Sequence, residues 1–144
     1  MRFLDRSLLH GPFLTLVTSQ REFRRVLKHL KLQDYPDYFV NKGSDATTHT
    51  FISEAGNLTC VVGFILNDAH SEIENLGLLV HEAVHVWQHV RAQIVSTIDT
   101  SRTGGLEAEM EAYAIQNISQ NLIEEFQRRV KNKSNTGEPV IQSE

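Results

Sequence analysis

Hydrophobic and polar residues follow two different periods along the chain, and each period predicts a kind of element. Behind the capping-box pair Ser19 and Glu22, apolar residues recur at helical spacing, which predicts a helix over 20–31. Between 47 and 66, two runs rich in Thr, Val, Ile and Phe flank the turn residues 55–57. This pattern predicts a β-hairpin.

Helical spacing returns in the second half of the chain. Ser71 and Glu74 form another capping box, and a helix is predicted over 72–95. Its apolar residues leave little room for a solvated face, so we expect it to be buried nearly all round. A last helix is predicted over 106–130.

The predicted elements together indicate an α+β fold. We expect a small sheet, formed by the hairpin and a third strand near 13–17, packed on the two later helices. The chain has no internal repeat and no low-complexity linker, so residues 1–130 are interpreted as a single domain. Residues 131–144, with Gly137, Pro139 and few apolar side chains, are predicted to be a disordered tail.

Composition narrows the class of protein. A chain of 144 residues with 40% hydrophobic residues and net charge −4 can bury one ordinary core. Its single cysteine, Cys60, excludes an intramolecular disulfide framework and a four-cysteine zinc ribbon. No apolar run is long enough to span a bilayer, so no membrane association is expected. Charged residues and Pro12 interrupt the first seventeen positions, which argues against a secretory signal and predicts a cytoplasmic protein.

Charge is distributed unevenly along the chain. Residues 1–31 carry seven Lys or Arg against two acids, whereas the remainder is acidic. A basic segment can contact nucleic acid. However, these cations lie at helix spacing between apolar residues, as on a solvated helix face, and the sequence contains no recognisable reader motif. We therefore do not expect nucleic acid as a partner.

The candidate chemistry lies in His81-Glu82-Ala83-Val84-His85, an HExxH motif within the predicted helix 72–95. Residues four apart on a helix lie about 6 Å from each other on one face, so both imidazoles can bind one metal ion. Glu82 lies beside them and is the candidate general base for a metal-activated water. The alternative is that the histidines are core residues bonded to backbone.

A catalytic zinc ion normally has three protein ligands. His89 lies four residues after His85 on the same helix face, but it is about 12 Å along the helix from His81, too far to share the ion. On a helical wheel of the last helix, Glu111 points to the apolar side, Glu107 lies near its edge and Glu109 points away. Glu111 is therefore the candidate third ligand, with Glu109 and Glu107 as alternatives. The alternative is that all three acids are solvated residues in the first turns of the helix, where the helix dipole stabilises negative charge.

Two segments, LLVHEAVHVWQ (78–88) and EMEAYAIQ (109–116), resemble zinc metallopeptidases of the gluzincin type, especially small uncharacterised members from phages and prophages. The resemblance implies a minimal zincin core, Zn²⁺ as cofactor, and a metal site completed by Glu109 or Glu111. It also implies that an edge strand, expected at 58–66 just before the metal helix, pairs with an extended substrate.

The function expected from these features is zinc-dependent cleavage of a peptide or protein substrate. His81, His85 and Glu111 would hold the metal, and Glu82 would take a proton from the attacking water. The alternative is a catalytically silent zincin-like module in which the metal is structural.

Overall fold

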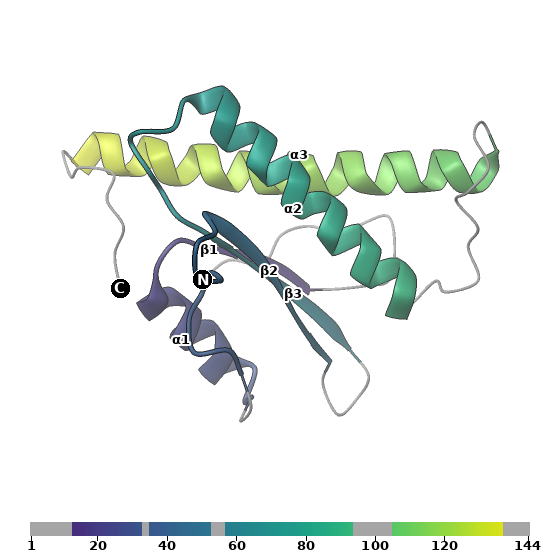
Figure 1. The fold of residues 1–144 in the computed structure, drawn as a ribbon, viewed down its shortest axis with the longest axis horizontal. Coiled ribbons are helices and arrows are strands. Elements are labelled where there is room, and N and C mark those ends of the chain that lie inside the picture. The colour runs from purple at the N-terminus through teal and green to yellow at the C-terminus, as the bar shows by residue number, and fades with distance from the viewer. Residues whose placement is uncertain (1–12, 33–34, 53–56, 94–104, 137–144) are drawn as a thin grey trace.

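The computed structural model describes residues 13–32, 35–52, 57–93 and 105–136, arranged as Figure 1 shows. The described residues contain, in chain order, β1 (Phe13–Val17), α1 (Gln20–His29), β2 (Ala46–Ile52), β3 (Leu58–Phe64), α2 (Glu72–Gln93) and α3 (Leu106–Thr136). The predicted α+β class is confirmed. The hairpin and the strand near 13–17 are both present.

The sheet is built around β3. Its strand order is β1-β3-β2, with β1 parallel and β2 antiparallel to β3. In this register Cys60 lies opposite Leu14 on one side and Thr50 on the other. All residues of β3 are buried, as expected for a strand covered on both faces.

Helices cover the two faces of the sheet unequally, with α1 on one side and both α2 and α3 on the other (Figure 1). Because side chains alternate across a strand, successive residues of β3 pack into two separate cores. Leu58, Cys60, Val62 and Phe64 belong to the core under α2 and α3. Val61 belongs to the core under α1. No helix in the described ranges has both the length and the hydropathy needed to cross a membrane.

The helix α2 is not buried nearly all round, so that prediction is wrong. Leu79, Ala83 and Val86 are buried against the sheet, but Ile73 is 82% exposed and Val80 is 40% exposed. The reason is that α2 belongs to an outer layer. Apolar residues on its solvent side have no further layer to contact.

The last helix extends further than predicted. It continues to Thr136, so the expectation of a tail that is disordered from residue 131 is wrong for 131–136, while 137–144 lie outside the described residues. Val130 still packs against the core, and Ser134 Oγ donates to the Val130 carbonyl at 3.1 Å. Once nucleated, a helix gains a hydrogen bond with each added residue, so polar residues can extend it.

A close backbone approach fixes the segment 35–45 on the α1 side of the sheet. The Phe39 carbonyl lies directly over Gly63 of β3, where a Cβ atom would come within 1.8 Å of the carbonyl oxygen. Gln20 holds the same segment, since its side-chain amide donates to the Asp37 carbonyl at 2.8 Å and accepts from Phe39 N at 2.9 Å. The Nε2 of the buried His49 lies 2.8 Å from the Phe39 oxygen and donates to it.

We expect Gly63→Ala to lower the free energy of unfolding by about 3 kcal/mol or more, because the methyl group would displace a backbone carbonyl rather than a flexible side chain. Urea unfolding followed by circular dichroism measures this. Gly77→Ala is the matched control: Gly77 lies exposed in α2 with nothing within 4 Å of its Cβ position, so alanine there should stabilise by about 1 kcal/mol. Equal stability of the two variants would contradict the close approach.

We also expect stability to fall as the pH falls below about 6.5, with His49 contributing to this loss. Burial lowers the pKa of His49 from 6.5, and the hydrogen bond to Phe39 and the charge of Glu82 offset this only in part. The unfolded chain therefore binds a proton that the folded chain resists. His49→Gln, which keeps a donor for Phe39, should show a smaller loss of unfolding free energy between about pH 7 and 5. The same pH dependence in both proteins would exclude His49 as a source of it.

Candidate metal centre

The structure brings His81 and His85 together on α2. Their Nε2 atoms lie 3.1 Å apart, and their ring centroids are separated by 4.8 Å. His81 is exposed and His85 is half-buried, so the pair faces outward from the helix. This is the side-by-side arrangement that the i, i+4 spacing predicts.

A neighbouring side chain orients His85. Its Nδ1 lies 2.8 Å from Oε1 of Gln88. Because an amide oxygen can only accept, Nδ1 carries the proton, and the lone pair on Nε2 accepts from Nε2–H of His81 at 3.1 Å. Hydrogen bonds of this kind to the distal ring nitrogen fix the tautomer of metal-binding histidines.

The pair fits part of a zinc site. Two imidazole nitrogens held at 2.0–2.1 Å by one tetrahedral zinc ion lie about 3.4 Å apart, close to the observed separation. Within the described ranges, however, no group of three His, Cys, Asp or Glu side chains is arranged to hold a metal ion. The described residues thus present two nitrogen ligands without a third protein ligand beside them.

Glu82 lies next to the pair but points toward the sheet. It is only 4% exposed, and its Oε2 accepts from Thr48 Oγ1 of β2 at 2.5 Å. This bond satisfies one oxygen of a buried carboxylate and fixes its orientation. Thr48 was not singled out from the sequence, and only the alternation of β2 could have indicated that it faces a helix.

Glu111 lies on a different side of α2. Trp87 Nε1 donates to its Oε2 at 2.7 Å, and Nη1 of Arg91 is 3.9 Å from the same oxygen. Trp87 lies about 200° around the helix axis from His85, so this contact keeps Glu111 away from the histidine pair. The two alternatives, Glu107 and Glu109, are exposed near the start of α3.

His89 is half-buried on the same side of α2 as His85. Burial, with a smaller contribution from repulsion by His85, lowers its pKa. The ring is therefore neutral at physiological pH.

The edge strand expected at 58–66 is not an edge strand. β3 is hydrogen-bonded on both sides, so it has no backbone groups left to pair with a peptide, and that expectation is wrong. Among the described strands, β2 has a single neighbour and also contacts α2 through Thr48. Of the described strands, β2 is therefore the one whose edge would pair with a peptide bound at the histidine site.

The comparisons with protein-family models, curated proteins and solved structures found no match for the chain. The similarity to gluzincin-type metallopeptidases of phages therefore stays a prediction that depends on the two sequence motifs.

Proposed function

We propose that the protein is a zinc-dependent metallopeptidase, with the metal held at His81 and His85. The observation that supports this most is the pair of Nε2 atoms 3.1 Å apart, with the lone pair of His85 directed by Gln88. The two ring nitrogens point toward each other on the solvent side of α2, where a metal ion would replace the hydrogen bond between them. A cytoplasmic location belongs to the same proposal, supported by the use of only one cysteine in the chain.

Within the motif, the histidines bind the metal and Glu82 transfers the proton. When bound, zinc lowers the pKa of a coordinated water toward neutrality. Glu82 takes the proton from the attacking water and delivers it to the leaving amine. Thr48, by holding Oε2 of Glu82, orients the carboxylate while it does so.

Glu111 is the third ligand in this proposal, with Glu109 and Glu107 as the alternatives. To join the histidines it must exchange its contacts with Trp87 and Arg91 for the metal. A hydrogen bond to a charged group contributes about 1.5–3 kcal/mol, whereas complete structural zinc sites contribute about 10–16 kcal/mol. The free energy of metal binding would have to exceed the loss of these contacts for Glu111 to become a ligand.

The proposed substrate is an extended peptide that adds to the edge of β2. Main-chain hydrogen bonds to an exposed strand edge bind a peptide with little dependence on its sequence. Since Thr48 of β2 contacts Glu82 directly, a peptide on this strand would run beside the candidate general base.

A second function is a zincin-like interaction module whose metal does not support turnover. The low exposure of Glu82, 4%, favours this alternative, because a general base must reach the attacking water. The position of Glu111 at Trp87 favours it as well.

Purified protein should contain about one zinc ion per chain by elemental analysis, and His81→Ala should lose it, because one imidazole cannot hold the ion alone. His70→Ala is the control, since His70 lies outside the motif and pairs with Asp45 at 3.6 Å. Equal zinc in all three proteins, or none in any, would contradict the site.

The same measurement tests the third ligand. Glu111→Gln should lower the zinc content if the carboxylate is a ligand, whereas Trp87→Phe should not, because it releases Glu111 without removing it. Loss of zinc in both variants would indicate that the contact between the two helices matters rather than the ligand.

Glu82→Gln should keep zinc and reduce the cleavage of an unfolded protein such as casein by a factor of about 100 or more, since it removes the general base. Thr48→Val is the matched variant: it leaves the carboxylate in place but removes its hydrogen-bond donor, so its loss of activity should be smaller. Unchanged cleavage by Glu82→Gln would exclude Glu82 as the base. Zinc without cleavage in the wild-type protein would favour the interaction module.

A further inference from the structure

A basic cleft lies between α1 and the C-terminal part of α3, far from the histidine pair along the chain. Its volume is about 520 Å³. The residues that line it are Thr18, Ser19, Arg21, Glu22, Arg25, Arg128, Arg129, Asn132 and Lys133. Five of these side chains are cationic and one is acidic, and none is aromatic.

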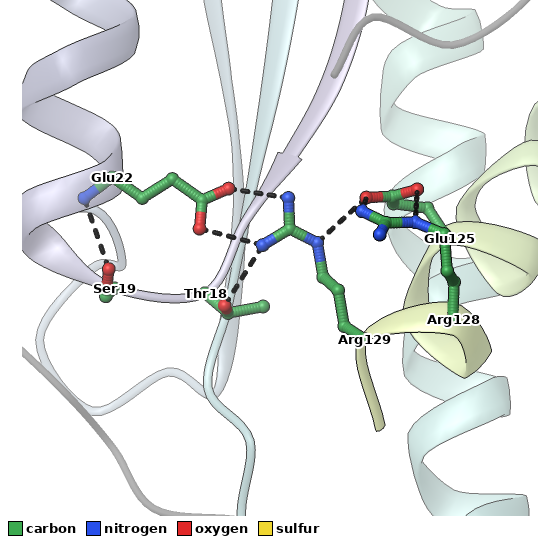
Figure 2. A network of polar contacts seen from close by, with 6 residues as sticks. All are labelled: Thr18, Ser19, Glu22, Glu125, Arg128 and Arg129. Atoms are coloured by element: carbon green, nitrogen blue, oxygen red, sulfur yellow. Dashed lines mark hydrogen bonds and ion pairs between the residues drawn. The ribbon is translucent and has the colours of Figure 1, made fainter. Parts of the chain in front are cut away.

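A polar network beside the cleft joins α1 to α3 (Figure 2). The guanidinium of Arg129 binds Glu22 through two nitrogens, at 2.6 and 2.7 Å, and also contacts Thr18 and Glu125. Glu125 is 1% exposed and accepts from Arg128 at 2.6 and 3.0 Å. This network connects residues more than 100 positions apart in the sequence.

The arginines of this network neutralise Glu22, which lines the cleft, and Glu125, which does not line it. Burial raises the pKa of Glu125, but the hydrogen bonds and charges of Arg128 and Arg129 outweigh burial and keep the pKa below its ordinary value. Glu125 is thus ionised and paired with Arg128 and Arg129, and Glu22 is paired with Arg129. Neither presents an uncompensated negative charge to a ligand.

Other cations of the cleft point to solvent. Arg21 and Arg25 lie one turn apart on α1, are exposed, and form no ion pair with any described residue. Arg128 binds Glu125 through Nε and Nη2 only, and its side chain is 41% exposed. Guanidinium groups present paired donors that match phosphate oxygens.

The positive surface continues beyond the cleft. Arg24 and Lys28 are exposed on the same side of α1, so the cations follow the helix over about 10 Å. A single phosphate group would need only the cleft, whereas a row of cations matches a row of phosphates.

One further carboxylate, the exposed Glu124, lies one turn before Arg128 on α3, and three others lie at the far end of the helix. On α3, Glu107, Glu109 and Glu111 occupy the first turns, and the distance from Glu109 to Lys131 along the helix is about 33 Å. The Debye length in physiological salt is about 8 Å, so these carboxylates are screened from the cleft. The net charge of the whole chain therefore does not describe what a ligand at this end encounters.

We propose that the cleft and the adjoining face of α1 bind the phosphate backbone of a nucleic acid. Arg21, Arg25 and Arg128 contact phosphates, and the absence of aromatic side chains from the cleft lining means that bases are not stacked there. Binding of this kind needs no reader motif and depends on salt concentration rather than sequence. It is independent of the metal site.

The test is fluorescence anisotropy with a short labelled oligothymidylate, in EDTA so that the metal site plays no part. Wild-type protein should bind, with affinity falling steeply between about 50 and 200 mM salt. Arg21→Gln combined with Arg25→Gln should weaken binding about tenfold and lower the salt slope by about 1.4. Both residues are exposed, so thermal unfolding should be unchanged.

The matched control is Lys42→Gln combined with Lys131→Gln, which removes two exposed charges outside the cleft lining. This variant should bind like the wild type. Equal weakening in both double variants would overturn the site in favour of attraction by net charge.

Two competitors identify the kind of ligand. Pyrophosphate that displaces the oligonucleotide at equal phosphate concentration would show a site for small phosphate compounds instead. Polyglutamate that displaces it equally well would indicate an acidic protein partner. Either result, or no binding by the wild type, overturns the nucleic-acid proposal.

Discussion

The burial of β3 on both faces is the constraint on which the rest of the structure depends. A strand with no solvent-exposed residue needs a layer of side chains above and below it, and the chain supplies these with α1 on one face and with α2 and α3 on the other. The alternation of β3 then separates two cores. The same constraint explains Gly63, since only a residue without a side chain lets the Phe39 carbonyl lie against the central strand.

Packing against the sheet also fixes the rotation of α2, and this rotation distributes the residues of the HExxH motif. Leu79, Ala83 and Val86 face the sheet, so Glu82 is turned toward β2 while His81 faces solvent. Trp87 is left on the side of α3, where it meets Glu111. Within the motif, Glu82 therefore faces the sheet, while His81 and His85 lie toward the surface.

The helix α3 links two regions of opposite charge. Its first turns carry carboxylates beside α2, while its last turns carry the arginines that meet α1. Because these ends lie several Debye lengths apart, they act as separate electrostatic surfaces.

Local patterns in the sequence determined the elements and part of the site. Capping boxes placed the starts of α1 and α2, alternation placed the hairpin, and i, i+4 spacing brought His81 and His85 together, because each of these depends on residues close in the chain. Only the tertiary structure decided which strand is central and which side of α2 is exposed. It also decided two long-range contacts, that of Glu111 with Trp87 and that of Arg129 with Glu22 and Glu125. These contacts depend on how helices of similar amphipathic pattern rotate and cross when they cover a shared sheet, and no periodicity within one segment encodes that choice.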